Sequence, residues 1–159
     1  MRHVISVTVE NKPGVLAHIS SLFAARGYSI DSLAVGETED PNVSRMTIVT
    51  RGDDQIIEQI TKQLRKLIST LKVQDLGEVE YIERDLVLIK VNVPSGKRSE
   101  ILEVVDIFRG KIVDVGAKDM VIELSGQESK IQAFMELLRP YGIKEMVRTG
   151  SIAIARGAK

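Results

Sequence analysis

The stretch from Glu10 to Leu16, ENKPGVL, holds the groups best suited to bind a small charged molecule. Pro13 has no N–H and Gly14 has no Cβ, so the backbone can approach a ligand closely while the first N–H groups of a following helix stay free. Such N–H groups attract an anion. The Asn11 amide both donates and accepts, which suits a ligand with an ammonium group beside a carboxylate. We therefore predict a site for a small zwitterion, while Gly and Pro are also ordinary residues before a helix.

The flanking residues predict that this stretch joins a strand to a helix. Residues 3–9 alternate between apolar and polar, whereas apolar residues recur at helical spacing over 15–23, and Gly27 follows as a stop. Residues 28–35 and 45–50 then predict a hairpin with a longer acidic loop. A long amphipathic helix with an N-capping Asp is expected over 54–71, and a final strand over 73–82.

The same order of elements occurs twice. A second strand-helix-strand-strand-helix-strand series is expected from residues 85–93, 101–108, 112–115, 120–124, 131–138 and 145–156, with capping-box spacing over 125–128. This order is the ferredoxin-like βαββαβ pattern. The sequence thus predicts an α+β fold of two tandem ferredoxin-like units, with a first domain at 1–82, a second at 83–159 and almost no linker.

Composition excludes several classes of protein. The chain has 159 residues with 43% hydrophobic content, so it can bury a core. Lys plus Arg equals Asp plus Glu at 22 each, and aromatic residues make up only 4%, which argues against a nucleic-acid partner and against base stacking on the sheet. The absence of a leader-like segment and of any apolar run near ~18 residues predicts a cytoplasmic protein that does not enter a membrane.

The residues offer little catalytic chemistry. His3 and His18 lie on a predicted strand and helix without an evident nucleophile, and the chain has no cysteine. The carboxylates fall mostly on solvated faces and loops, so no metal site is expected. Residues 95–98 form a basic helix start that could hold an anion. They lack the glycine spacing of a Walker phosphate-binding loop, and such a run is more often an exposed helix cap. An acylphosphatase-like activity is also disfavoured, because the loop after the first strand mixes Glu10 with Lys12. We expect no catalytic residues and no cofactor held by this chain.

Several segments resemble one family closely. VTVENKPGVLAHI from Val7, followed by FAARGYSIDSLAVGETEDPNVSRMTI from Phe23, is similar to the ACT domain of acetolactate synthase small subunits. IFRGKIVDVG and TGSIAIARG in the second unit resemble the C-terminal domain of the same subunits. The resemblance covers essentially the whole chain.

The resemblance implies a non-catalytic regulatory subunit that activates a separate catalytic large subunit and confers feedback inhibition by valine or another branched-chain amino acid. Thiamine diphosphate, Mg and FAD would then belong to the catalytic partner. It also implies a homodimer through the ACT domains, with effector held by the turn of one chain and the second strand of the other. The residues that match these segments are Asn11, Gly14, Val15, Leu16, Ser29 and Ile30.

One position departs from the family, since Ser29 stands where Asn is frequent, and this leaves open which branched-chain amino acid is preferred. The kind of protein on which this chain acts also stays open, and two hypotheses remain. The first is the regulatory subunit of a catalytic partner, and the second is a stand-alone ACT-type amino-acid sensor that acts on another protein.

Overall fold

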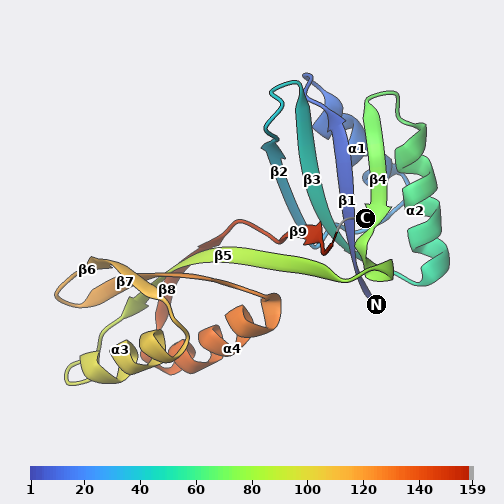
Figure 1. Ribbon diagram of the computed structural model, residues 1–159. Helices are drawn as coiled ribbons and strands as arrows, with labels where there is room; N and C mark the ends of the chain where they lie inside the picture. The colour runs from blue at the N-terminus through green and yellow to red at the C-terminus, as the bar shows by residue number, and fades with distance from the viewer. Residues whose placement is uncertain (158–159) are drawn as a thin grey trace. The chain divides into compact units, whose positions relative to one another are not determined.

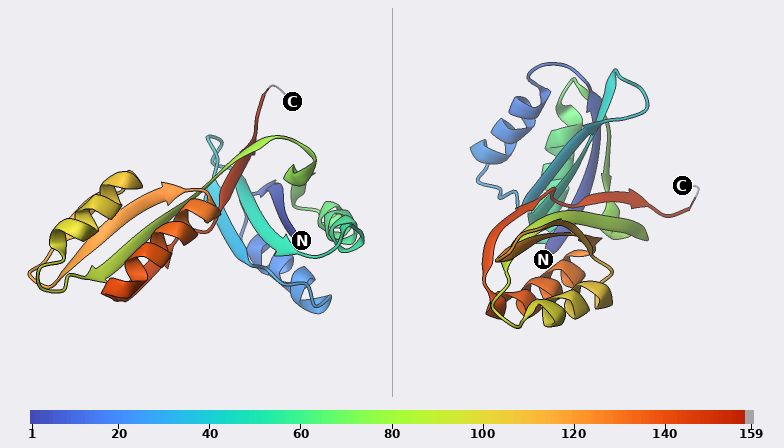
Figure 2. Two further views of the ribbon diagram at one scale, coloured as in Figure 1. Left: turned by 90° about the horizontal axis from the view of Figure 1, so that it is seen from below. Right: turned by 90° about the vertical axis from the view of Figure 1, so that its left-hand side faces the viewer.

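The computed structural model describes residues 1–157, which form two compact units (Figure 1). In each unit two helices cover one face of an antiparallel sheet, as the views in Figure 2 show. The predicted fold class, two tandem ferredoxin-like βαββαβ units, is confirmed by the order of elements. No helix within this described range is long and apolar enough to cross a membrane.

The division into units differs from the predicted domains at one end. The second unit covers residues 83–150, and the first contains residues 1–82 together with residues 151–157. The expected second domain, 83–159, differs from this division by contacts, because the end of the described chain packs against the first sheet. Residues 158 and 159 lie outside the described residues.

The first unit holds the predicted binding turn. Its elements are β1 (Arg2–Glu10), α1 (Val15–Ala25), β2 (Ser32–Glu37), β3 (Val43–Arg51), α2 (Asp54–Lys66), β4 (Thr70–Asp75) and the short 3-10 helix η1 (Leu76–Glu78). The strands lie in the order β2-β3-β1-β4, and every neighbouring pair is antiparallel. Strand β2 is consequently an edge strand.

The helices of this unit cover the sheet because each carries an apolar stripe. The buried stripe residues are Val15, Ile19, Leu22 and Phe23 on α1 and Ile57, Ile60, Thr61 and Leu64 on α2. These pack against alternate residues of β1, among them Ile5 and Val7, in one hydrophobic cluster. The predicted N-cap of α2 is present, since the Asp53 carboxylate accepts a hydrogen bond from Ile56 N at 2.9 Å.

The second unit repeats this plan. Its elements are β5 (Tyr81–Asn92), α3 (Arg98–Ile107), β6 (Lys111–Val115), β7 (Asp119–Gly126), α4 (Glu128–Leu138), the 3-10 helix η2 (Arg139–Tyr141) and β8 (Ile143–Arg148), with strand order β6-β7-β5-β8. Phe134 is fully buried in the hydrophobic core of this unit, and the centroid of its ring lies 5.2 Å from that of Phe108. Where β5 meets β8, the buried Asp85 carboxylate accepts from Arg148 Nη2 at 2.6 Å and from Thr149 Oγ1 at 3.2 Å.

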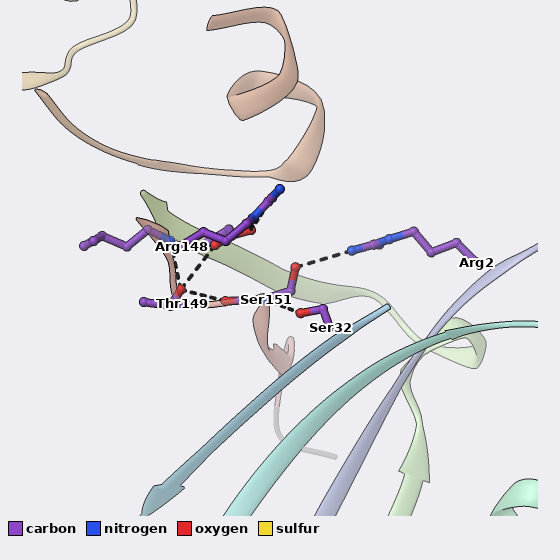
Figure 3. Close-up of polar contacts among 8 residues, drawn as sticks. Arg2, Ser32, Arg148, Thr149 and Ser151 are labelled. Atoms are coloured by element: carbon purple, nitrogen blue, oxygen red, sulfur yellow. Dashed lines mark hydrogen bonds and ion pairs between the residues drawn. The ribbon is translucent and has the colours of Figure 1, made fainter. Parts of the chain in front are cut away.

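The end of the described chain forms a separate strand, β9 (Ile152–Ala155), rather than the predicted single strand over 145–156. Gly150, with φ of 83°, turns the chain after β8. Ser151 and Ala153 are then buried against the face of the first sheet that the helices leave uncovered. Ser151 N donates to Ser32 Oγ at 2.9 Å, and Arg2 Nη2 donates to Ser151 Oγ at 3.4 Å (Figure 3). We call residues 151–157 the C-terminal strap.

Two other predicted boundaries and one predicted capping motif are wrong. The strand expected over 73–82 ends at Asp75, because its carboxylate accepts from Gly77 N at 2.9 Å and starts η1. Helix α2 stops at Lys66, so the last apolar residues of the stripe lie beyond it. The capping box expected over 125–128 is absent, since Ser125 is part of β7 and the N-cap of α4 is Gln127.

The strap leads to a stability prediction. Removing residues 151–159 is expected to destabilise the first unit by about 2 kcal/mol, because Val4, Val49 and Leu76 become more exposed and full burial of one such side chain is worth about 1.5–3 kcal/mol. Hydrogen exchange measures this directly, with faster exchange expected for β1 and β3 amides. Amides of α4 and β7 serve as the internal control. Unchanged exchange in β1 and β3 would contradict the structural role of the strap.

Candidate effector site

The turn between β1 and α1 has the open geometry that its residues predict. Gly14 precedes α1 with φ of +86°, in the left-handed region that favours glycine, and a Cβ on it would meet no atom within 4 Å. No side chain caps the helix, and its first turn carries no acidic residue. The N–H groups of Leu16 and Ala17 find no acceptor within the described part of the chain. The helix start therefore presents free donors to open space, which favours an anion.

Asn11 uses part of its hydrogen-bonding capacity to stabilise this turn. Its backbone N donates to Asn42 O at 2.8 Å, and its side-chain Nδ2 donates to Pro41 O at 2.9 Å. The loop between β2 and β3 is thereby tied to the turn. One hydrogen of the Nδ2 group and both lone pairs of Oδ1 remain for a ligand. The sequence indicated Asn11 as a ligand-binding residue but not this second role, although the Asp-Pro-Asn segment that supplies Pro41 is a recognisable turn signal.

Two apolar residues of the predicted site differ in exposure. Val15 is only 6% exposed and belongs to the hydrophobic core, so it anchors the helix start and does not offer a surface to a ligand. Leu16 is 43% exposed and lies next to the free N–H groups. At this end of the site, Leu16 is therefore the residue whose side chain can make an apolar contact with a ligand.

The second predicted segment, Ser29 and Ile30, precedes β2. The carbonyl of Ser29 accepts a hydrogen bond from Thr50 Oγ1, which fixes its backbone, and its side chain is exposed. Ile30 packs partly against the core. Sequence patterns did not point to Thr50, because a hydroxyl that binds a distant carbonyl leaves no local spacing signal.

A single chain does not bring the two segments together. The turn lies beside the start of β3, where Glu10 pairs with Val43. Ser29 and Ile30 lie beside its end, where Ser32 pairs with Val49. A strand rises about 3.3 Å per residue, so the two ends are roughly 20 Å apart. Figure 1 shows the turn after β1 and the start of β2 at opposite ends of the sheet.

The rest of the chain offers no clear catalytic arrangement among the residues that the structure describes. His3 Nδ1 lies 3.7 Å from Asp75 Oδ2, with no Ser or Thr hydroxyl bonded to the imidazole. Within residues 1–157, no group of three or more His, Asp or Glu side chains is arranged to hold a metal ion. The pKa of Glu100 is lowered by the hydrogen bond from Tyr141 and then by Lys97, but these three groups lie on the surface of the second unit.

Two family models together match most of the chain. Residues 5–72 match the ACT domain of the small subunit of acetohydroxyacid synthase, AHAS, and residues 84–157 match the small subunit of acetolactate synthase. The chain belongs to the acetolactate synthase small subunit family. The small-subunit match thus includes the strap as well as the second unit.

Whole-length relatives agree with this membership. The acetolactate synthase small subunit of Aquifex aeolicus is 54% identical over 156 residues, which cover 98% of this chain and 81% of that protein. The small subunit from Mycolicibacterium smegmatis is 47% identical and covers 99% of this chain and 92% of its own length. The crystal structure of the small subunit from Thermotoga maritima is 44% identical, with a TM-score of 0.91 over 100% of this chain and 99% of that one. Each of the two units thus has the fold found in a small subunit of this family.

Proposed function

We propose that this chain is the regulatory subunit of acetolactate synthase, which activates the thiamine-diphosphate-dependent catalytic subunit and confers feedback inhibition by valine. The observation that carries the proposal is the whole-length correspondence with small subunits, strap included. Thiamine diphosphate, Mg and FAD belong to the catalytic partner. This chain itself is non-catalytic, and it acts by binding an effector and the partner.

The proposed effector site forms between two copies of the chain. Strand β2 is an edge strand whose Val35 is 46% exposed, and an open edge invites pairing with another strand. A two-fold axis beside β2 would pair it antiparallel with the same strand of a second copy. That pairing carries the start of one β2, with Ser29 and Ile30, toward the end of the other sheet that holds the turn. The separation of about 20 Å within one chain thus supports a homodimer with two equivalent sites.

Each group of valine has a partner in such a site. Its carboxylate accepts hydrogen bonds from the N–H groups of Leu16 and Ala17, assisted by the positive end of the α1 dipole. Its ammonium donates to Asn11 Oδ1, with the Ser29 hydroxyl as a second acceptor. Its branched side chain contacts Leu16 of one copy and Ile30 of the other. Gly14 keeps the approach to the helix start open.

Complex formation with the catalytic subunit tests the proposed role. Purified chain mixed with the recombinant catalytic subunit from the same organism is expected to elute with it in size-exclusion chromatography, at a fixed ratio once the chain is in excess. A mixture with an unrelated thiamine-diphosphate enzyme of similar size is the control. If the two subunits elute separately at every ratio, with and without valine, the chain is a sensor for some other protein.

A further inference from the structure

A polar hollow lies on the face of the first sheet opposite its helices. Its volume is about 270 Å³, and the C-terminal strap forms part of its wall. The polar side chains that line it are Ser6, Thr8, Arg45, Lys72 and Gln74. This hollow is separate from the turn at Gly14, and none of the proposed effector-binding residues lines it.

The register of the strands explains why these side chains meet. Thr8 on β1 is directly opposite Arg45 on β3 and also opposite Lys72 on β4. Ser6, two residues earlier on the same face, is opposite Gln74. Neighbouring strands are about 4.8 Å apart, so two cations stand on either side of one hydroxyl, with roughly 10 Å between their backbones. Their long side chains can reach toward the same ligand.

The charges in this hollow are not balanced. Arg45 Nε donates to Ser6 Oγ at 2.9 Å and Arg45 Nη2 donates to Ala153 O at 3.3 Å, which uses two of the five guanidinium N–H groups and fixes its position. No carboxylate of residues 1–157 lines the hollow. Neither Arg45 nor Lys72 forms an ion pair with any residue between 1 and 157. A partly buried guanidinium usually has an anionic partner, and none of the described residues supplies one here.

We propose that the hollow binds a phosphate-class oxyanion, either inorganic phosphate or the phosphoryl group of a small metabolite. A dianion can accept hydrogen bonds from Arg45 and Lys72 at the same time, and the Thr8 hydroxyl lies between them. A carboxylate has one charge and two oxygens, so it satisfies fewer of these donors. Because the strap lines the hollow, a bound oxyanion also links the strap to β1, β3 and β4. This site does not depend on the proposed regulatory function.

Lys72 is the residue to change, because its ammonium has no hydrogen-bond partner among the described residues and its removal leaves the sheet and strap contacts intact. Arg45 is less suitable, since it also holds Ala153. Lys72→Gln is expected to weaken phosphate binding about tenfold, the effect of losing one charge-assisted hydrogen bond. Lys62→Gln is the matched control, because Lys62 is an exposed lysine on α2 that pairs with Glu58.

The test is an NMR titration of the full chain with inorganic phosphate at constant ionic strength, maintained with chloride. We expect saturable shifts of amides around Thr8, Arg45 and Lys72 in the wild type and in Lys62→Gln. In Lys72→Gln the midpoint is expected at about tenfold higher phosphate. Shifts that follow ionic strength alone, or an equal midpoint in both lysine variants, would overturn the site.

Two further titrations identify the class of ligand. Methyl phosphate, a monoester, is expected to saturate the same amides, and tighter binding than inorganic phosphate would identify a phosphorylated metabolite as the source. Weaker binding of the monoester would identify inorganic phosphate. Acetate is expected to give no saturation over the same range. Acetate binding as tight as that of phosphate would contradict the phosphate class.

Discussion

Gly14→Asp is expected to abolish valine binding and to leave the subunit folded. The new carboxylate lies where we place the carboxylate of valine, at the free N–H groups of Leu16 and Ala17. Two like charges about 4 Å apart at an effective dielectric near 20 repel by about 4 kcal/mol, which is roughly a thousandfold in affinity. A Cβ at position 14 meets no neighbouring atom, so steric conflict does not add to this effect.

Backbone strain is a second consequence of any side chain at position 14. Gly14 has φ of +86°, and the left-handed region costs an ordinary L-residue about 1–2 kcal/mol. Gly14→Asn is therefore the matched control, because Asn has the shape of Asp and tolerates this region, but it carries no charge. Isothermal titration with valine should give measurable binding for Gly14→Asn and none for Gly14→Asp, with equal circular dichroism. If both variants bind valine like the wild type, the helix start is only a turn.

Mixed dimers are expected to recover binding that each parent variant has lost. If each site uses the turn of one copy and Ser29 and Ile30 of the other, Gly14→Asp damages one half of the site and Ser29→Trp the other. Ser29 is exposed and its carbonyl is fixed by Thr50, so Trp fills the ligand space without disturbing the core. A dimer of one Gly14→Asp chain and one Ser29→Trp chain contains one site with both changes and one site with neither.

The two-fold symmetry of the dimer sets the fraction of valine-binding sites that is recovered. Random assortment of the two variants makes half of the dimers mixed, so about a quarter of all sites are intact. Calorimetry on co-refolded chains should give this fraction with wild-type affinity, and sedimentation should show dimers throughout. Ser29→Ala, which removes only the hydroxyl, is expected to bind valine on its own. Recovery of no sites in the mixture would show that both segments act within one chain or that the site lies elsewhere.

Periodic patterns in the sequence predicted most of the elements. The apolar stripes of α1 and α2 and the alternation of β1 are strong because each element buries one face, so helical or strand spacing is visible in the residue types. The repeated order of elements then predicted the fold class. At the candidate site, the types of Asn11 and Gly14 indicated an open helix start, and the structure has one with free N–H groups.

The strap shows what the patterns could not reveal. Its alternation suggests that Ile152 and Ile154 are buried, yet they are 57% and 54% exposed, whereas Ser151 and Ala153 face the first sheet. The small residues fit there because the contact is close. The backbone is fixed because Ser151 N donates to Ser32 Oγ and Arg45 Nη2 donates to Ala153 O. These partners are more than a hundred residues away in sequence, so no local pattern records them. The hydrogen bond from Asn11 to the Pro41 carbonyl was also missed, because its partner lies 30 residues away in sequence.

The rate of acetolactate formation by the catalytic subunit, measured with and without this chain over a range of valine concentrations, tests the central claim most directly. We expect the chain alone to form no product, and the catalytic subunit to become faster when the chain is added. Valine should then reverse this gain, with a coupling of about 1–3 kcal/mol, or roughly 5- to 150-fold in apparent affinity. The Gly14→Asp chain should activate equally and remain insensitive to millimolar valine. Product formed by the purified chain alone, or an unchanged rate when it is added, would contradict the proposed regulatory role.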